Sequence, residues 1–225
     1  MTGPAAPLPV LVRTDRYVAV DKPSGLAVHR GDCRDRVTAL DLVRDDMGCW
    51  VYPVHRIDRG TSGVVLFALD PESAASLQAC FNASTVEKRY LALVRGCPPD
   101  EGVIDHPVPK SEGGPRVPAV TDFRRLAAVE RCALVEARPR TGRFHQIRRH
   151  LKHIGHPLIG DANYGKGALN RAYRDDVGLA RLALHASALS FPDPWTGERV
   201  RAVAEIPDDL AAPLVRLGFH LPNAM

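Results

Sequence analysis

The chain has 225 residues, of which 45% are hydrophobic and 25% are charged. This composition excludes wholesale disorder and is sufficient for a hydrophobic core in one large domain or two small ones. The formal net charge of +4 is too small to indicate a nucleic-acid partner by itself, so the distribution of the charges matters more than their sum.

The cysteines and the N-terminal segment bear on the cellular compartment. The five cysteines are an odd number and form no C-x-x-C pair, so we expect reduced thiols and neither a disulfide framework nor a zinc ribbon. The segment MTGPAAPLPVLVRTD has no basic start and no long apolar core, which argues against a signal peptide or a membrane span. We therefore expect a cytoplasmic protein with no membrane partner. Residues 1–9 are predicted to form a flexible tail and residues 10–225 a single domain.

The first half of the chain predicts strands and helices in alternation. RYVAVDKPSGLAVH is typical of a strand, a turn and a second strand, with KPSG at the turn. TSGVVLFALD is a continuous apolar run, which indicates a buried strand. DPESAASLQACF predicts a helix with Asp70 as its N-cap and a proline in its first turn. In DRVTALDLVRDDMG, apolar residues recur at helical spacing, namely Val37, Leu40, Val43 and Met47.

The second half predicts mostly strands. EKRYLALVRG alternates polar and apolar residues and reads as a strand ending at Gly96, and residues 97–118 predict a loop or a short hairpin. AVTDFRRLAAVE and CALVEARP predict two antiparallel strands, and LALHASALSFPDP and ERVRAVAE two more. HQIRRHLKHIG predicts a helix with one apolar face. Because no βαβ rhythm is present, we expect an α+β fold with a mixed, mostly antiparallel sheet and flanking helices.

The segment HRIDRGTSG, residues 55–63, concentrates charge around one carboxylate. Asp58 is flanked by Arg56 and Arg59, with His55 close by, so we expect it to stay ionised. One interpretation is a salt-bridged residue that caps a turn, because surface ion pairs of this kind are common. The other is a carboxylate held ready for chemistry. These residues alone favour the first interpretation and leave the second open.

A basic block follows in RPRTGRFHQIRRHLK, residues 138–152, which holds six Arg or Lys, two His and no acid. Such an unopposed block indicates a polyanion as partner. If a helix begins near Phe144, Arg148 and Lys152 lie one turn apart and flank its apolar face; the alternative is a solvated amphipathic helix. The nearby histidines lack a carboxylate or cysteine placed to complete a metal site, so no metal is expected.

Tyr90 lies inside the strand predicted for EKRYLALVRG. A tyrosine in a strand is usually half-buried packing, but its ring can also hold an unpaired nucleobase by stacking. Other chemistries lack their motifs, because the sequence has no G-x-G-x-x-G, no P-loop and no G-x-S-x-G elbow. HRIDRG is superficially similar to the kinase H-R-D loop, but the rest of the kinase set is absent.

Four other segments stand in a fixed order around HRIDRGTSG. VAVDKPSGLAVH precedes it, and EKRYLALVRG, RTGRFHQIRRHL with GHPLIGD, and LHASALSF follow it. Together the five resemble the boxes of the RluA-type pseudouridine synthases, in which HRIDRGTSG matches the form H-R-[LI]-D-x-x-T-S-G. They span about residues 10 to 200, so the resemblance covers nearly the whole chain and is specific.

The resemblance implies an enzyme that isomerises a uridine of structured RNA to pseudouridine and needs no cofactor. It implies that Asp58 is the nucleophile, that Arg148 is its charge partner, and that Tyr90 stacks on the flipped uracil beside Ile147. The residues that it implies in RNA binding are Arg56, which would fill the space of the flipped base, and Arg59, Arg143, Arg149 and Lys152. We expect the form without an N-terminal S4 domain, since Met1 lies only nine residues before the first strand.

The substrate follows from the same likeness. LVRTDRYVAVDKPSGLAVHR, YPVHRIDRGTSGV and GRFHQIRRHL look most similar to a tRNA-modifying branch of the family, which implies tRNA as the partner and uridine 65 as the target. We expect a monomer, although no sequence pattern indicates the oligomeric state. The alternatives are a ribosomal RNA synthase of the same family and a non-catalytic RNA-binding module. Asp58, Tyr90 and Arg148 argue against the module. A retaining glycosidase would need a second carboxylate at a matching box, and none is evident.

Overall fold

The structure is a computed structural model that describes residues 6–31 and 36–220. The chain divides into two compact units. The first comprises residues 1–87 and 186–204, and the second comprises residues 88–185 and 205–225. Residues 1–5 of the predicted tail lie outside the described residues, and the single domain over residues 10–225 stays a prediction.

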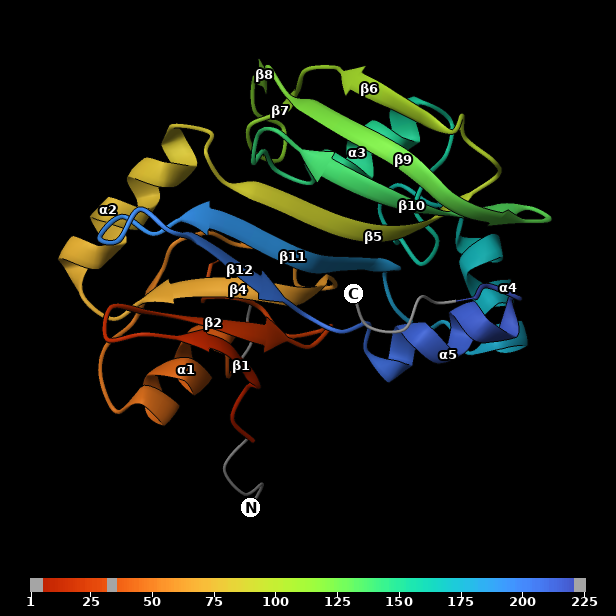
Figure 1. Cartoon of the computed structure of the whole chain (residues 1–225). Helices are drawn as coiled ribbons and strands as arrows, with labels where there is room; N and C mark the ends of the chain where they lie inside the picture. Colours follow the sequence, from red (N-terminus) through yellow and green to blue (C-terminus); the bar gives the residue numbers. More distant parts are fainter. Residues whose placement is uncertain (1–5, 32–35, 221–225) are drawn as a thin grey trace. The chain divides into compact units, whose positions relative to one another are not determined.

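The first unit is built on a sheet flanked by two helices. Its elements are β1 (Val10–Arg13), β2 (Tyr17–Lys22), α1 (Ala39–Met47), β3 (Tyr52–Pro53), β4 (Ser62–Ala68), α2 (Pro71–Asn82), the part of β11 (Leu184–Pro192) from Ala186 onward, and β12 (Arg199–Val203). The strand order is β1, β2, β4 and β11 (Figure 1). Strand β12 pairs with β11, and β3 pairs with β4. The pairs β1–β2, β2–β4, β3–β4 and β11–β12 are antiparallel.

The predictions for β4 and α2 are confirmed. All seven residues of β4 are buried, as the continuous apolar run predicted. Helix α2 begins after Asp70, whose carboxylate accepts a hydrogen bond from the backbone N–H of Ser73 at 2.8 Å. This bond satisfies one of the N–H groups that the first turn of a helix leaves unpaired.

Two predictions near α1 are wrong. Residues 26–29 form no strand, because the carbonyl groups of Ala27 and Val28 accept hydrogen bonds from Ala39 and Leu40 at the start of α1. Val37 does not belong to the inner face of the helix: it precedes the N-cap, Thr38, and is 42% exposed. The capping box of Thr38 and Asp41 sets the helix start two residues later than the apolar spacing suggested.

The second unit holds further antiparallel strands. Its elements are β5 (Glu87–Arg95, from Lys88 onward), β6 (Glu101–Asp105), β7 (Val108–Pro109), β8 (Arg116–Val117), β9 (Val120–Val129), β10 (Cys132–Pro139), α3 (Gln146–His153), α4 (Gly167–Val177) and α5 (Asp208–Arg216). The order of the main strands is β5, β10, β9 and β6, and β7 pairs with β8 (Figure 1). The predicted β9–β10 pair and the short hairpin are confirmed, whereas β6, α4 and α5 were not predicted.

Helices cover both faces of this sheet. On one face, Val135 of β10 packs in a cluster with Ile147 and Leu151 of α3. On the other, Leu134 packs in a cluster with Leu214 of α5. Successive residues of a strand point to opposite faces, which explains how neighbours in β10 join separate cores. The predicted α+β fold with a mostly antiparallel sheet is confirmed.

Candidate functional site

Asp58 lies in a tight turn of the first unit. The backbone N–H of Thr61 donates to the carbonyl of Asp58 at 3.0 Å and closes the turn. The predicted KPSG turn packs on it, because the N–H of Gly25 donates to the carbonyl of Arg59 at 2.8 Å and the hydroxyl of Ser24 donates to that of Gly60 at 2.8 Å. Two segments far apart in the sequence thus hold the backbone that carries Asp58.

Lys22 ties these two turns together from inside. It is fully buried, at 0% exposure, and its ammonium donates to the carbonyls of Pro23 at 2.8 Å, Leu26 at 2.7 Å and Arg59 at 3.4 Å. A buried cation is tolerated where oxygen atoms surround it in this way. Sequence reasoning treated Lys22 as part of a turn and missed this role, although its place in the first box was a signal.

The flanks of the turn are equally fixed. Nε2 of His55 accepts a hydrogen bond from the backbone N–H of Leu66 at 3.2 Å, and its ring stacks on Phe81. Gly63 has a φ of +110°, and a Cβ at this position would lie 2.2 Å from the carbonyl oxygen of Ala186. Only glycine therefore permits this approach of β4 to β11.

The charged side chains of this turn differ in their exposure to solvent. Arg56 and Arg59 are exposed, and Asp58 is half-buried. The hydroxyl of Thr61 is buried and has no hydrogen-bond partner within the described part of the chain. The turn thus offers a carboxylate and two guanidinium groups at its surface, with an unused hydroxyl beneath them.

In the second unit, Arg148 of α3 is anchored by a carboxylate that sequence reasoning missed. Its Nε and Nη2 donate to the two carboxylate oxygens of Asp161, both at 2.8 Å, and both side chains are largely buried. Burial alone would raise the pKa of Asp161, but the hydrogen bonds and charge of Arg148 lower it below its usual value. The interpretation of α3 as a solvated helix is wrong, because Arg148 and four of its neighbours in α3 are buried.

An aromatic ring organises the other cations of α3. The guanidinium groups of Arg148 and Arg149 lie 5.0 Å from the centre of the Tyr164 ring, and the ammonium of Lys152 lies 5.7 Å from it. The Tyr164 hydroxyl lies 3.0 Å from Nδ1 of His145. Cation–π contacts of this length are attractive. Asp161 and Tyr164 both belong to GHPLIGDANYG, so their place beside the third box was the available signal.

The remaining predicted residues of this unit fall into two groups. Tyr90 is half-buried and packs, with its β5 neighbours, against the cluster that contains Ile147 of α3. Both interpretations of Tyr90 therefore remain compatible with its position, as packing and as a stacking surface near Ile147. Arg143 and Lys152 are exposed, and Arg149 is half-buried between the rings of Phe144 and Tyr164.

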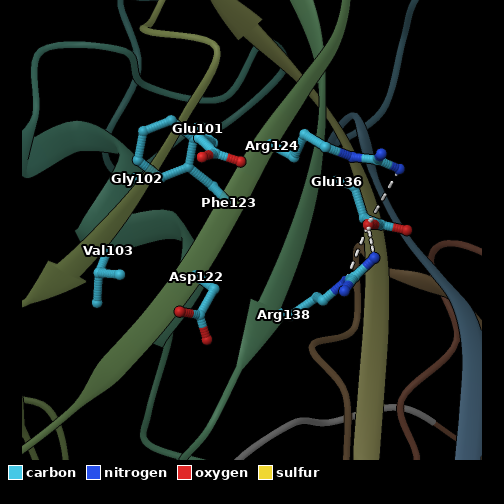
Figure 2. A pocket seen from close by; sticks show the side chains of 8 residues that line it. All are labelled: Glu101, Gly102, Val103, Asp122, Phe123, Arg124, Glu136 and Arg138. Carbon is cyan, nitrogen blue, oxygen red and sulfur yellow. Dashed lines mark hydrogen bonds and ion pairs between the residues drawn. The ribbon is translucent and has the colours of Figure 1, made fainter.

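A cavity of about 310 Å³ lies elsewhere in this unit, on the sheet (Figure 2). One of its lining residues is Glu136, whose carboxylate pairs with Arg138 at 2.5 Å, Arg124 at 3.8 Å and Arg89 at 3.9 Å. Glu136 and Arg138 alternate with β10 residues that pack toward α3, so they face away from that helix. The lining residues are Glu101, Gly102, Val103, Asp122, Phe123, Arg124, Glu136 and Arg138.

Metal-binding clusters and membrane-spanning helices are two further features that bear on the function of the chain. Within residues 6–31 and 36–220, no group of three or more His, Cys, Asp or Glu side chains is arranged to hold a metal ion. Among the same residues, no helix is long and apolar enough to cross a bilayer.

Comparison with known proteins identifies the family. Residues 16–153, which include the Asp58 turn, Tyr90 and α3, match the RNA pseudouridylate synthase family. The chain belongs to this family. It is 37% identical over 238 residues to tRNA pseudouridine synthase C of Haemophilus ducreyi, covering 96% of this chain and 98% of that protein. It is 40% identical over 222 residues to the Pasteurella multocida protein of that name, covering 88% and 91%.

Solved structures of this family agree with the fold. Human RNA Pseudouridylate Synthase Domain Containing 4 superposes with a TM-score of 0.79 at 28% identity, over 96% of this chain and 95% of that one. Human RNA Pseudouridylate Synthase Domain Containing 1 gives a TM-score of 0.76 at 28% identity, over 94% and 90%. The predicted family resemblance is therefore confirmed.

Proposed function

We propose that this pseudouridine synthase isomerises a specific uridine of a tRNA to pseudouridine. The observation that carries the proposal is the family match over residues 16–153, which includes the Asp58 turn and the Arg148 helix. The tRNA target is supported by the curated relatives, which are named tRNA pseudouridine synthase C and match this chain over most of its length. The target nucleotide, expected at uridine 65, is part of the proposal.

The reaction rearranges bonds within one nucleotide. The bond between N1 of uracil and C1′ of the ribose breaks, the base turns, and a new bond forms between C5 and C1′. The proton on C5 is lost to solvent and N1 gains one, so nothing is oxidised and no group is added. We assign the nucleophile to Asp58, which would attack either C1′ or the uracil ring. The Lys22-supported turn holds its backbone.

The other site residues have roles in holding the substrate. Tyr90 would stack on the uracil after it has left the helix, beside Ile147. Arg148 is proposed as the charge partner of Asp58, and its ion pair with Asp161 holds its side chain in place. Arg56, which is exposed in the Asp58 turn, would fill the space of the flipped base.

Release of tritium from tRNA labelled at uracil C5 tests catalysis. The wild-type protein should release tritium, and Asp58→Asn should release none while keeping the wild-type melting temperature. A matched control is Asp45→Asn, because Asp45 is an exposed carboxylate of the same unit that pairs with Arg44 on α1; it should retain activity. Equal release by wild type and Asp58→Asn would exclude Asp58 as the nucleophile. Absence of release by wild type would favour a non-catalytic RNA-binding module.

The choice of RNA needs a separate experiment. Total RNA from a strain lacking this gene should be incubated with the protein and its new pseudouridines mapped. The expected result is one new site in tRNA, at uridine 65. New sites confined to ribosomal RNA would overturn the tRNA assignment and support a ribosomal RNA synthase, while leaving the chemistry of Asp58 intact.

The basic residues are proposed to bind phosphates and to set the register on the RNA, with no role in reading its sequence. They are Arg59, Arg143, Arg149 and Lys152. Replacing Arg143, Arg149 and Lys152 with alanine should weaken binding and reduce the slope of log affinity against log salt by roughly 0.7–0.9 for each lost contact. An unchanged slope would exclude the phosphate-binding role.

We also propose that the protein acts in the cytoplasm as a monomer. The compartment is supported by the cysteines at 49, 80, 97 and 132, which are free thiols in the structure, and by the tRNA substrate. Light scattering of the purified protein tests the monomer; a mass near twice 24.5 kDa would contradict it.

A further inference from the structure

Lys88 is a cation that the functions described above leave unassigned. It precedes Tyr90 by two positions in β5, so both side chains lie on the same face of the strand. It is half-buried, and its ammonium donates to the carbonyl of Thr141 at 3.1 Å. Thr141 lies in the loop that joins β10 to α3. Lys88 therefore stands where the strand of Tyr90 meets the loop that leads into the Arg148 helix.

Arg143, two positions after Thr141, is the charged neighbour of Lys88. Its Nε donates to the carbonyl of Pro118 at 3.4 Å, and its side chain is exposed. Gly142 lies between Thr141 and Arg143 in the sequence, and a Cβ at this position would be 3.9 Å from the ammonium of Lys88. The loop thus places the glycine backbone of residue 142 beside the ammonium of Lys88, and the guanidinium of Arg143 follows directly in the sequence.

These two cations lack a counter-ion within the described part of the chain. The ion pairs there supply a carboxylate to Arg138 and to Arg140, but none to Lys88 or Arg143. Desolvation, and then the charge of Arg143, lower the pKa of Lys88 to about 8. Holding an ammonium partly away from water, beside a second cation, is unfavourable for the free protein.

We propose that Lys88 and Arg143 together bind one backbone phosphodiester of the RNA substrate, next to the nucleotide held by Tyr90. The proposal rests on the proposed function for its ligand, but it concerns binding and not the chemical step. A phosphate supplies the missing negative charge and accepts several hydrogen bonds at once. In a partly desolvated position its attraction to two cations is stronger than on an open surface. Lys88 thereby adds a phosphate contact from β5, the strand that also carries Tyr90.

Binding of an unmodified tRNA transcript tests the proposal. Affinity is measured at several salt concentrations in the Asp58→Asn background, where no turnover interferes, so a failure of catalysis and a failure of this site give different results. Lys88→Met should weaken binding about tenfold and reduce the salt slope by roughly 0.7–0.9. Lys88→Arg should keep the wild-type slope. Lys110→Met is the matched control, because Lys110 is an exposed lysine of the β7–β8 hairpin; it should change neither quantity.

Two further readouts separate the proposal from a purely structural role. Lys88→Met should leave the melting temperature of the free protein unchanged or higher, because it removes an uncompensated charge. The double variant Lys88→Met/Arg143→Ala should lose no more than about one unit of salt slope in total, since both side chains share one phosphate. A lower melting temperature of Lys88→Met with an unchanged salt slope would overturn the proposal. A loss of about two units of salt slope in the double variant would show that Lys88 and Arg143 bind two separate phosphates, which would overturn the shared one.

Discussion

Replacing Asp161 with asparagine measures how strongly the candidate site depends on its buried ion pair. The substitution keeps the size of the side chain and one of its oxygens. That oxygen can still accept the backbone N–H groups of Asn163 at 2.9 Å and Tyr164 at 3.1 Å. The new amide, however, presents N–H donors to Nε of Arg148, which is itself a donor. Arg148 can keep the bond from Nη2 to the retained oxygen, but its buried charge loses the carboxylate of Asp161.

The expected cost follows from burial. The side chains of Arg148 and Asp161 are only 9% and 1% exposed, and removing one partner of such a pair costs about 3–5 kcal/mol. The same unit holds a control with the same two-bond geometry, in which Nε and Nη2 of Arg140 donate to Asp122. That pair is 60% and 33% exposed, so Asp122→Asn should cost only about 0.2–1 kcal/mol.

Thermal and urea unfolding give the comparison. For a chain of this size, the loss at Asp161 corresponds to a fall of about 6–20 °C in Tm. Its pH dependence has a definite sign: because the folded pKa of Asp161 is lowered, its contribution is present above the unfolded value and is lost as pH falls through the folded one. The difference between wild type and Asp161→Asn should therefore shrink below about pH 4. Equal losses for Asp161→Asn and Asp122→Asn would refute the argument from burial.

Three further substitutions test the scaffold of the first unit. Gly63→Ala should destabilise it by about 3 kcal/mol or more, because φ is +110° and the carbonyl of Ala186 lies in the way; a stable variant with an unchanged urea midpoint would contradict this. Lys22→Met should cost about 3 kcal/mol, since the carbonyl groups of Pro23 and Leu26 lose a donor and that of Arg59 keeps only the N–H of Gly25. Tyr17→Phe should cost about 1.5–3 kcal/mol, because its hydroxyl donates to the carboxylate of Asp193 at 2.6 Å; urea unfolding measures both.

Elements whose signals are local were predictable from the sequence. The buried strand β4 needs only its apolar run, and α2 needs only Asp70 and the proline that follows. The strand expected at residues 26–29 failed because its carbonyl groups are used by the start of α1, a partner that no local pattern indicates. Helix α4 fully buries none of its side chains within the described structure; Tyr173 and Val177 only partly bury theirs against a core cluster, so its apolar signal is weak.

The candidate site shows the same division. Asp58, Tyr90 and Arg148 were predicted because motifs mark them, whereas the residues that support Asp58 and Arg148 were missed because each acts on a segment distant in the sequence. Lys22 supports a turn 37 positions away, and Asp161 holds a guanidinium 13 positions away. Neither residue type is expected to be buried. Only the three-dimensional packing shows that their charges are compensated.

Some unfavourable local features of the chain lie in the segments that carry the proposed site. The hydroxyl of Thr61 and Nε of Arg149 are the buried side-chain polar atoms without a hydrogen-bond partner in the described residues. His145 begins α3 with a φ of +53°, in a region that favours glycine. Lys88 of β5, in the same unit as α3, has no counter-ion among the described residues. Buried polar groups are normally satisfied, so the Thr61 hydroxyl and Nε of Arg149 are exceptions. An RNA that supplies phosphates and base edges would satisfy such groups, and their cost in the free protein is then the consequence of a site prepared for its substrate.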